Sequence, residues 1–272
     1  MRLVLLFVLA VLSSFFPKAG SAQEPLLDVE AYHRAVDFCR QQSWPGFTLS
    51  PDKNILCFGT IIPTHLDVSE AQELEPDGLF VVRSGGGDVA SAIALAELIR
   101  DRRATVVAYD HCLSACASVL LIASVRTYVL KGTLVAWHLP DGSDATHPYC
   151  TNVLPSSSGP PKLQRGPCID PQSAGDGAAY RLVIPVQRHF LEERVLDPSY
   201  EDPPDSLHIR RTLINLFRER GVYENIAWTL NPRYYPRLFK TKIYYEAYPE
   251  SQEEVDEMAR RVPISSKVIY DP

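Results

Sequence analysis

The sequence lacks several patterns that would assign it to common classes of protein. Its 27 Lys and Arg residues are outnumbered by 33 Asp and Glu residues, the formal net charge is −6, and the basic residues are scattered. Nucleic-acid binding needs clustered Lys and Arg, so we expect no nucleic-acid partner. No Cys-x-x-Cys pair and no Cys/His spacing of a zinc site occurs, and we therefore expect no metal.

Nucleotide-binding signatures are also missing. The sequence contains neither G-x-G-x-x-G nor a Gly-Lys-Ser/Thr of the P-loop type, so nucleotide binding is not expected, and we predict no cofactor. Internal repeats are absent as well. After the N-terminal segment no apolar run approaches the length that spans a bilayer, which takes about 20 residues.

One apolar run is present at the N-terminus. It extends over residues 3–16, follows Arg2, stops before Pro17 and is followed by the small residues 19–22. This layout predicts a secretory signal peptide over residues 1–22, and an uncleaved membrane anchor is the alternative. Both place the rest of the chain outside the cytosol, in the periplasm or secreted. Residues 23–272 have a length that suits one domain.

The six cysteines fit an oxidising compartment. They fall into three local pairs along the chain: Cys39 with Cys57, Cys112 with Cys116, and Cys150 with Cys168. Sequence alone does not fix their connectivity, and free buried thiols are the alternative. If residues 112–116 are helical, the Cα atoms of the second pair lie about 6 Å apart, within the range of a disulfide.

Strand and helix patterns alternate between residues 28 and 138. Apolar residues at helical spacing predict helices over 28–42, from the cap Asp88 to residue 99, and over 114–123. Strands are predicted at 55–62, 79–82, 105–109, 126–130 and 133–137. This order predicts right-handed βαβ crossovers and a mainly parallel sheet.

The character of the chain changes after residue 139. Residues 140–177 are dense in Pro, Gly and Ser, which predicts a long loop that overhangs the site and gates substrate entry, restrained by Cys150 and Cys168. Beyond the loop, helices are predicted over 178–195, 205–220, a shorter stretch through 228, and 251–261, with a strand over 242–248.

Three short segments carry candidate chemistry. The glycine turn 84–87 lies between a strand and the helix that Asp88 caps, and its backbone N–H groups can approach a phosphate or an oxyanion. Ser114 stands where a strand passes into a helix of small residues, and the Ala115 N–H can help to hold an oxyanion. His138 ends an apolar strand and can serve as a base. Each also has an ordinary interpretation: a tight turn, a helix cap and a structural histidine.

Together these segments resemble the ClpP/crotonase superfamily, and within it the ClpP-type serine peptidases. The cysteines that flank Ser-Ala are similar to those of exported bacterial ClpP-like proteins, and the resemblance covers residues 54–140. It implies an α/β fold with a ClpP/crotonase-like sheet of ββα repeats and a helical C-terminal arm. It also implies Ser114 as nucleophile, His138 as general base, and an oxyanion hole at Gly86, Gly87 and Ala115.

One position departs from the family's pattern. The family's third catalytic residue is an Asp in the C-terminal part, but residues 224–235 contain none, and Asn231 stands near where it would fall. An Asn can orient a catalytic His, so Asn231 is the candidate, and a Ser/His dyad without a third residue is the alternative. The leading hypothesis is a serine peptidase that acts on a peptide or protein substrate, with a possible homo-oligomer and no ATPase partner. The alternatives are a catalytically inactive binding or assembly protein of the same fold and a crotonase-like acyl-CoA enzyme.

Overall fold

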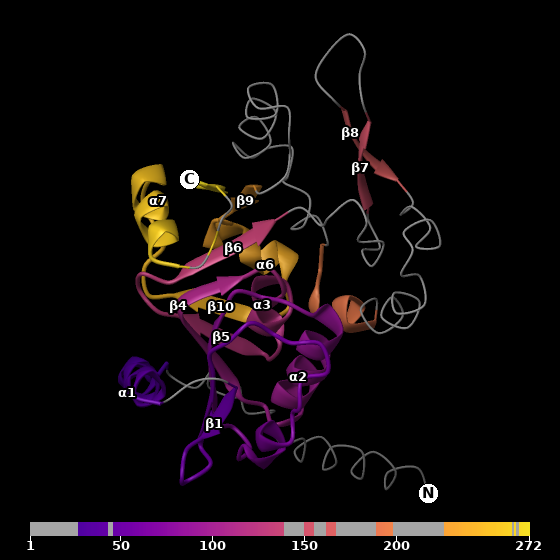
Figure 1. Ribbon diagram of the computed structural model, residues 1–272. Coiled ribbons are helices and arrows are strands. Elements are labelled where there is room, and N and C mark those ends of the chain that lie inside the picture. Colours follow the sequence, from indigo (N-terminus) through magenta and orange to yellow (C-terminus); the bar gives the residue numbers. More distant parts are fainter. Residues whose placement is uncertain are drawn as a thin grey trace, which may run out of the picture.

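The computed structural model describes residues 27–42, 46–138, 150–154, 162–166, 189–197, 226–262, 264 and 267–272. Within them the chain forms a mixed α/β fold around a sheet of mostly parallel strands (Figure 1). The expected signal peptide, most of the loop over residues 140–177, residues 178–188 of the helix predicted over 178–195, and the helix predicted over 205–220 lie outside the described residues.

The N-terminal part alternates strands and helices as the sequence predicts. In chain order it contains α1 (Val29–Arg40), β1 (Phe47–Leu49), β2 (Ile55–Phe58), η1 (Glu70–Glu73), β3 (Leu79–Ser84), α2 (Val89–Asp101) and β4 (Thr105–Leu113). The predicted cap of α2 is confirmed, because the Asp88 carboxylate accepts a hydrogen bond of 2.8 Å from the Ser91 N–H.

The remaining described elements include more strands than expected. They are α3 (Ala115–Ser118), η2 (Leu120–Ile122), β5 (Arg126–Val129), β6 (Leu134–His138), β7 (Cys150–Leu154), β8 (Lys162–Gly166), β9 (Ile226–Trp228), η5 (Pro232–Tyr234), α6 (Tyr235–Leu238), β10 (Lys242–Tyr245), α7 (Gln252–Arg260) and β11 (Lys267–Ile269). Residues 189–194 are also helical. The helices of this part are therefore accompanied by strands β9, β10 and β11.

Strand β4 organises the sheet. The order is β1-β2-β3-β4-β6-β9-β11, and β5 pairs with both β4 and β10. The first half of β4 pairs in parallel with β5, whereas its last three residues pair in parallel with β6. An irregularity at Asp110, whose φ is 56°, separates the two halves. Only the β1–β2 and β6–β9 pairs of this described sheet are antiparallel, so the prediction of a mainly parallel sheet is confirmed.

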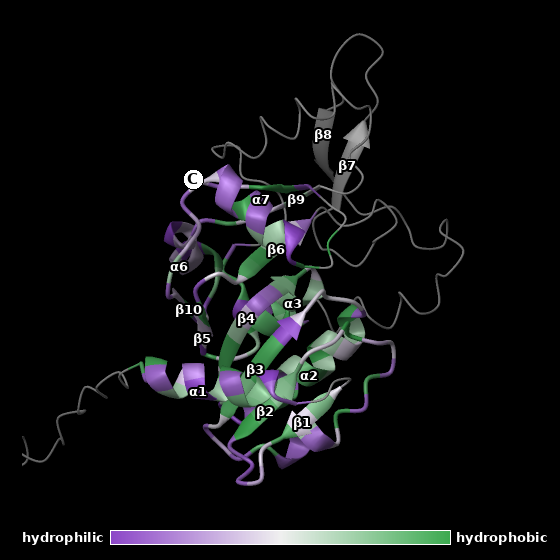
Figure 2. Ribbon diagram, turned by 60° about the vertical axis from the view of Figure 1, so that its left-hand side comes forward, coloured by the Kyte–Doolittle hydropathy of each residue, from purple (hydrophilic) through white to green (hydrophobic). Residues whose placement is uncertain are grey.

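Helices cover both faces of the sheet. Val106 and Ala108 of β4 belong to the core cluster that includes α2 and α3, whereas Val107 and Tyr109 pack with α1. Leu113, at the end of the same strand, packs in a third cluster with α7. A strand buried on both faces needs apolar side chains in every position. This explains the continuous apolar runs of the sequence, which give β2, β3 and β4 their mostly green colour in Figure 2.

Three local predictions are corrected by the structure. The helix expected over residues 114–123 stops after Ser118, because Val119 leaves the helical region at φ −123° and a 3-10 turn follows. The helix expected through Trp228 is wrong, since residues 226–228 form β9 and supply β6 with an antiparallel neighbour. Within the loop over 140–177, β7 and β8 pair as an antiparallel ribbon.

Cysteines link elements on both sides of the sheet. Cys39 of α1 and Cys57 of β2 form a disulfide with a Cα–Cα distance of 5.5 Å, and Cys112 pairs with Cys116. These two bridges are compatible with an oxidising compartment. Cys168 lies outside the described residues, so its predicted pairing with Cys150 stays a prediction. Among the residues that the structure describes, no helix has the length and apolar character needed to cross a membrane.

Candidate active site

Ser114 and His138 lie together at the carboxyl ends of two paired parallel strands. Ser114 directly follows β4, and His138 is the last residue of β6, which pairs with the second half of β4. The Ser114 Oγ is 2.7 Å from the His138 Nε2. At this distance the hydroxyl donates a hydrogen bond to the ring nitrogen when that nitrogen is unprotonated. The geometry expected of a nucleophile and its base is therefore present.

The backbone of Ser114 adopts an unusual conformation. Its φ of 55° and ψ of −125° lie where residues other than glycine are rare. Hydrogen bonds hold the residue on both sides: its N–H donates to the Ala136 carbonyl at 3.1 Å, and its carbonyl accepts from the Ser118 N–H at 2.9 Å. Such a backbone costs of the order of 1–3 kcal/mol and persists where its surroundings fix it.

A disulfide encloses the turn that contains Ser114. Cys112 comes from β4 and Cys116 from α3, and their Cα atoms are 5.1 Å apart. The predicted bridge is therefore present, although it connects a strand to a helix and does not lie within one helix. Both cysteines are fully buried. The bridge closes the strand-to-helix turn that contains Ser114, so it limits the movement of that residue's backbone.

The glycine turn packs against Ser114 so closely that no side chain fits. Gly86 has a φ of 90°, and a Cβ there would lie 2.6 Å from the Ser114 Cβ and 2.9 Å from the Ala115 nitrogen. Gly87 has a φ of 136°, and its Cβ would lie 2.2 Å from the Ile62 carbonyl oxygen. Both positions thus require glycine on grounds of backbone conformation and of space. The turn is held between Ser114 on one side and Ile62 on the other.

The backbone N–H groups around Ser114 differ in what they bind. The Gly86 N–H donates to the Ser84 Oγ at 3.1 Å, and the Ser114 N–H is bonded to Ala136. Gly87 is exposed, and the Ala115 N–H is the first of α3, where no helical acceptor exists. Neither the Gly87 nor the Ala115 N–H donates to another described residue. Of the three residues assigned to an oxyanion hole, these two retain available donors.

Asn231 lies in a different setting from the one expected of a third catalytic residue. It caps η5, where its Oδ1 accepts a hydrogen bond of 3.0 Å from the Arg233 N–H. Its own N–H donates to the Asp271 Oδ2 at 2.8 Å. Asn231 also lines a groove with Tyr128 and Tyr248. A role in orienting His138 stays a prediction.

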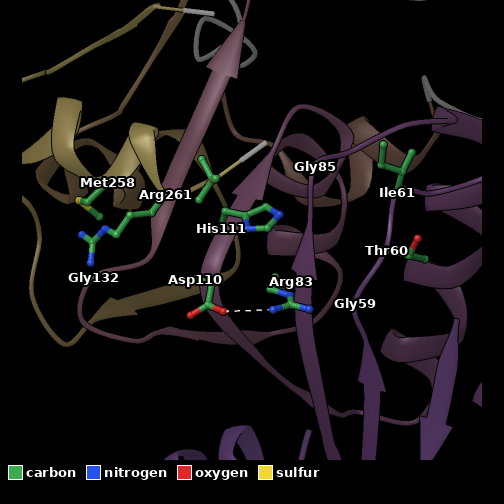
Figure 3. Close-up of a pocket in the computed structure, with 11 residues that line it drawn as sticks. Gly59, Thr60, Ile61, Arg83, Gly85, Asp110, His111, Gly132, Met258 and Arg261 are labelled. Atoms are coloured by element: carbon green, nitrogen blue, oxygen red, sulfur yellow. Dashed lines mark hydrogen bonds and ion pairs between the residues drawn. The ribbon is translucent and has the colours of Figure 1, made fainter. Parts of the chain in front are cut away.

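A cavity of about 540 Å³ begins beside the glycine turn, and sequence analysis did not identify it. Figure 3 shows its charged and polar side chains, among them Arg83, Asp110, His111 and Arg261. Burial, reinforced by the nearby Arg83 guanidinium, holds the pKa of His111 below its usual value, although Asp110 opposes the shift. In the described part of the chain no three His, Cys, Asp or Glu side chains are grouped as metal ligands.

Comparison with known proteins gives a weak likeness in structure and none in sequence. No protein-family model and no curated protein matches the chain. Among solved structures it is similar to a mutant of ClpP1 from Listeria monocytogenes, with 18% sequence identity and a TM-score of 0.26. The match covers 33% of this chain and 58% of that chain, and so spans little more than half of the length of ClpP1. No residue role or activity is transferred from a likeness of this size.

Proposed function

We propose that this protein is an exported, ClpP-like serine hydrolase that cleaves a peptide or protein substrate through an acyl-enzyme on Ser114. The observation that carries the proposal is the 2.7 Å contact between the Ser114 Oγ and the His138 Nε2. A serine that merely caps a helix would bond to a backbone N–H of that helix, as Asp88 does in α2. The Ser114 side chain makes no such capping bond.

The chemistry follows from the positions of these groups. His138 takes the hydroxyl proton while the Ser114 Oγ attacks the substrate carbonyl carbon, and it then passes that proton to the departing amine. The carbonyl oxygen becomes an oxyanion, for which the N–H groups of Gly87 and Ala115 are the donors. Water, deprotonated by His138, subsequently releases the acyl group. Donors fixed by a tight turn stabilise the oxyanion without having to reorganise during the reaction.

The proposal extends to architecture and location. Residues 23–272 form one domain with the ββα repeats of the ClpP/crotonase superfamily, and residues 1–22 are removed on export. The disulfides Cys39–Cys57 and Cys112–Cys116 support an oxidising compartment. No ATPase partner is expected there, and a homo-oligomer remains part of the proposal.

A fluorophosphonate probe tests the nucleophile directly. We expect the probe to label the purified exported protein, Ser114→Ala to abolish labelling, and His138→Gln to slow it by about two to four orders of magnitude, since general-base catalysis contributes that much. Ser69→Ala and His65→Asn, in exposed loop positions, are the matched controls and should be labelled at the rate of the unchanged protein.

Two results would contradict the proposal. One is a folded protein that the probe does not label, which would favour a binding or assembly protein. The other is label recovered on a residue other than Ser114 when the modified peptide is identified by mass spectrometry.

A further inference from the structure

The cavity beside the glycine turn gathers residues from distant parts of the chain. Gly59 to Ile61 follow β2, Arg83 belongs to β3, and Asp110 and His111 belong to β4. Met258 and Arg261 come from α7 and the residue that ends it. A volume of about 540 Å³ is within the range of about 300–1,000 Å³ that is usual for ligand sites.

The charges in this cavity are predominantly positive. Asp110 supplies the one carboxylate among the lining residues, and two guanidinium groups share it: Arg40 at 2.9 Å and Arg83 at 3.4 Å. Arg261 adds a further positive charge and makes no ion pair with any described residue. This excess is local, because the chain as a whole has a formal net charge of −6. A concave site with an excess of one sign of charge attracts ligands of the other sign.

Neutral donors and an apolar rim complete the site. The N–H groups of Thr60 and Ile61 donate no hydrogen bond to another described residue, and both residues line the cavity. The Ile61 side chain is 65% exposed, which is unusual for a large apolar residue, and it lies at the cavity beside Gly85. A ligand that fits these features has an anionic group and a small apolar part.

We propose that this cavity binds a carboxylate group of a peptide, with Arg261 as its principal partner. The cavity adjoins the catalytic turn, because Gly85 lines it and precedes Gly86, which packs on Ser114. Arginine suits the task, since its planar guanidinium can donate two parallel hydrogen bonds to one carboxylate. The peptide nature of the ligand rests on the proposed function. The carboxylate is either the C-terminus of the peptide or the side chain of an acidic residue.

Binding to full-length exported protein that carries Ser114→Ala tests this inference without turnover. The probes are N-acetyl-trialanine, its C-terminal amide, and N-acetyl-Ala-Glu-Ala amide, titrated by calorimetry. We expect a carboxylate peptide to bind about tenfold or more tightly than the neutral amide, as a charge-assisted hydrogen bond would give. Preference for the first peptide identifies a C-terminal carboxylate, and preference for the third identifies an acidic side chain.

Neighbouring arginines provide a matched pair of variants. Arg261→Gln should remove the preference for a carboxylate, Arg261→Lys should restore part of it, and Arg260→Gln should leave it unchanged, because Arg260 is exposed and does not line the cavity. Equal binding or no binding of all three peptides would overturn the inference, as would equal losses in the two Gln variants. Because Ser114 is absent from every sample, these outcomes are independent of whether the fluorophosphonate test succeeds.

Discussion

Removing the disulfide that encloses the Ser114 turn should slow the reaction of Ser114, whereas removing the other disulfide should lower stability more and leave that reaction unchanged. The double variant Cys112→Ala/Cys116→Ala opens a loop with a sequence separation of 4, whereas Cys39→Ala/Cys57→Ala opens one with a separation of 18. The chain-entropy relation gives a loss of about 2 kcal/mol for the first loop and about 3 kcal/mol for the second. By this relation the Cys39→Ala/Cys57→Ala variant should have the lower free energy of unfolding of the two.

Reactivity should follow the opposite order. The Ser114 backbone conformation at φ 55° has a cost of about 1–3 kcal/mol, and the Cys112–Cys116 bridge is among the constraints that hold it. If the turn relaxes by that amount, the reactive geometry becomes about 5 to 150 times less populated, because 1.4 kcal/mol corresponds to a factor of ten.

The assay compares the two double variants with the unchanged protein. Fluorophosphonate labelling rates report on Ser114, and urea unfolding gives the free energies of unfolding. We expect the 112/116 variant to be labelled at least fivefold more slowly while folded, and the 39/57 variant to be labelled at the normal rate. A normal labelling rate in the folded 112/116 variant would refute a role of this disulfide in reactivity, as would a loss of reactivity in both variants in proportion to their loss of stability.

Three further outcomes are expected. Gly86→Ala should slow labelling of Ser114 by at least tenfold and lower the free energy of unfolding by more than about 1 kcal/mol. The new Cβ would lie 2.6 Å from the Ser114 Cβ, at a φ of 90°. Normal labelling of this variant would contradict the packing of Gly86 on Ser114. The folded pKa of His111 is depressed below the ordinary histidine value of about 6.5, so protonation favours the unfolded chain. The free energy of unfolding should therefore fall as the pH drops from about 6.5 through the folded pKa. In urea titrations His111→Gln should reduce this fall. A variant with the same pH dependence of stability as the unchanged protein would contradict the depressed pKa of His111. Intact mass spectrometry of the exported protein should show a chain that begins at Gln23, whereas a retained N-terminus would indicate an anchor.

The sequence alone determined those helices and strands whose stabilising features lie in consecutive residues. The helix after Asp88 could be predicted because its cap and its apolar spacing are properties of consecutive residues, and the structure has α2 at Val89–Asp101. The strands around β4 could be predicted because burial on both faces requires unbroken apolar runs. The contact between Ser114 and His138 could also be predicted, because neighbouring parallel strands bring their carboxyl ends to the same edge of the sheet.

Tertiary structure alone decided the features that depend on partners distant in sequence. Residues 226–228 carry no strand pattern strong enough to outweigh the helix prediction, and they become β9 because β6 offers them a free edge. The turn at Ser114 takes its strained backbone from hydrogen bonds to Ala136 and from the packing of Gly86, both of which are non-local. Arg83 and Arg261 line the same cavity only because α7 packs against the sheet. Contacts of this kind join segments that are distant in sequence, so the pattern of consecutive residues does not predict them.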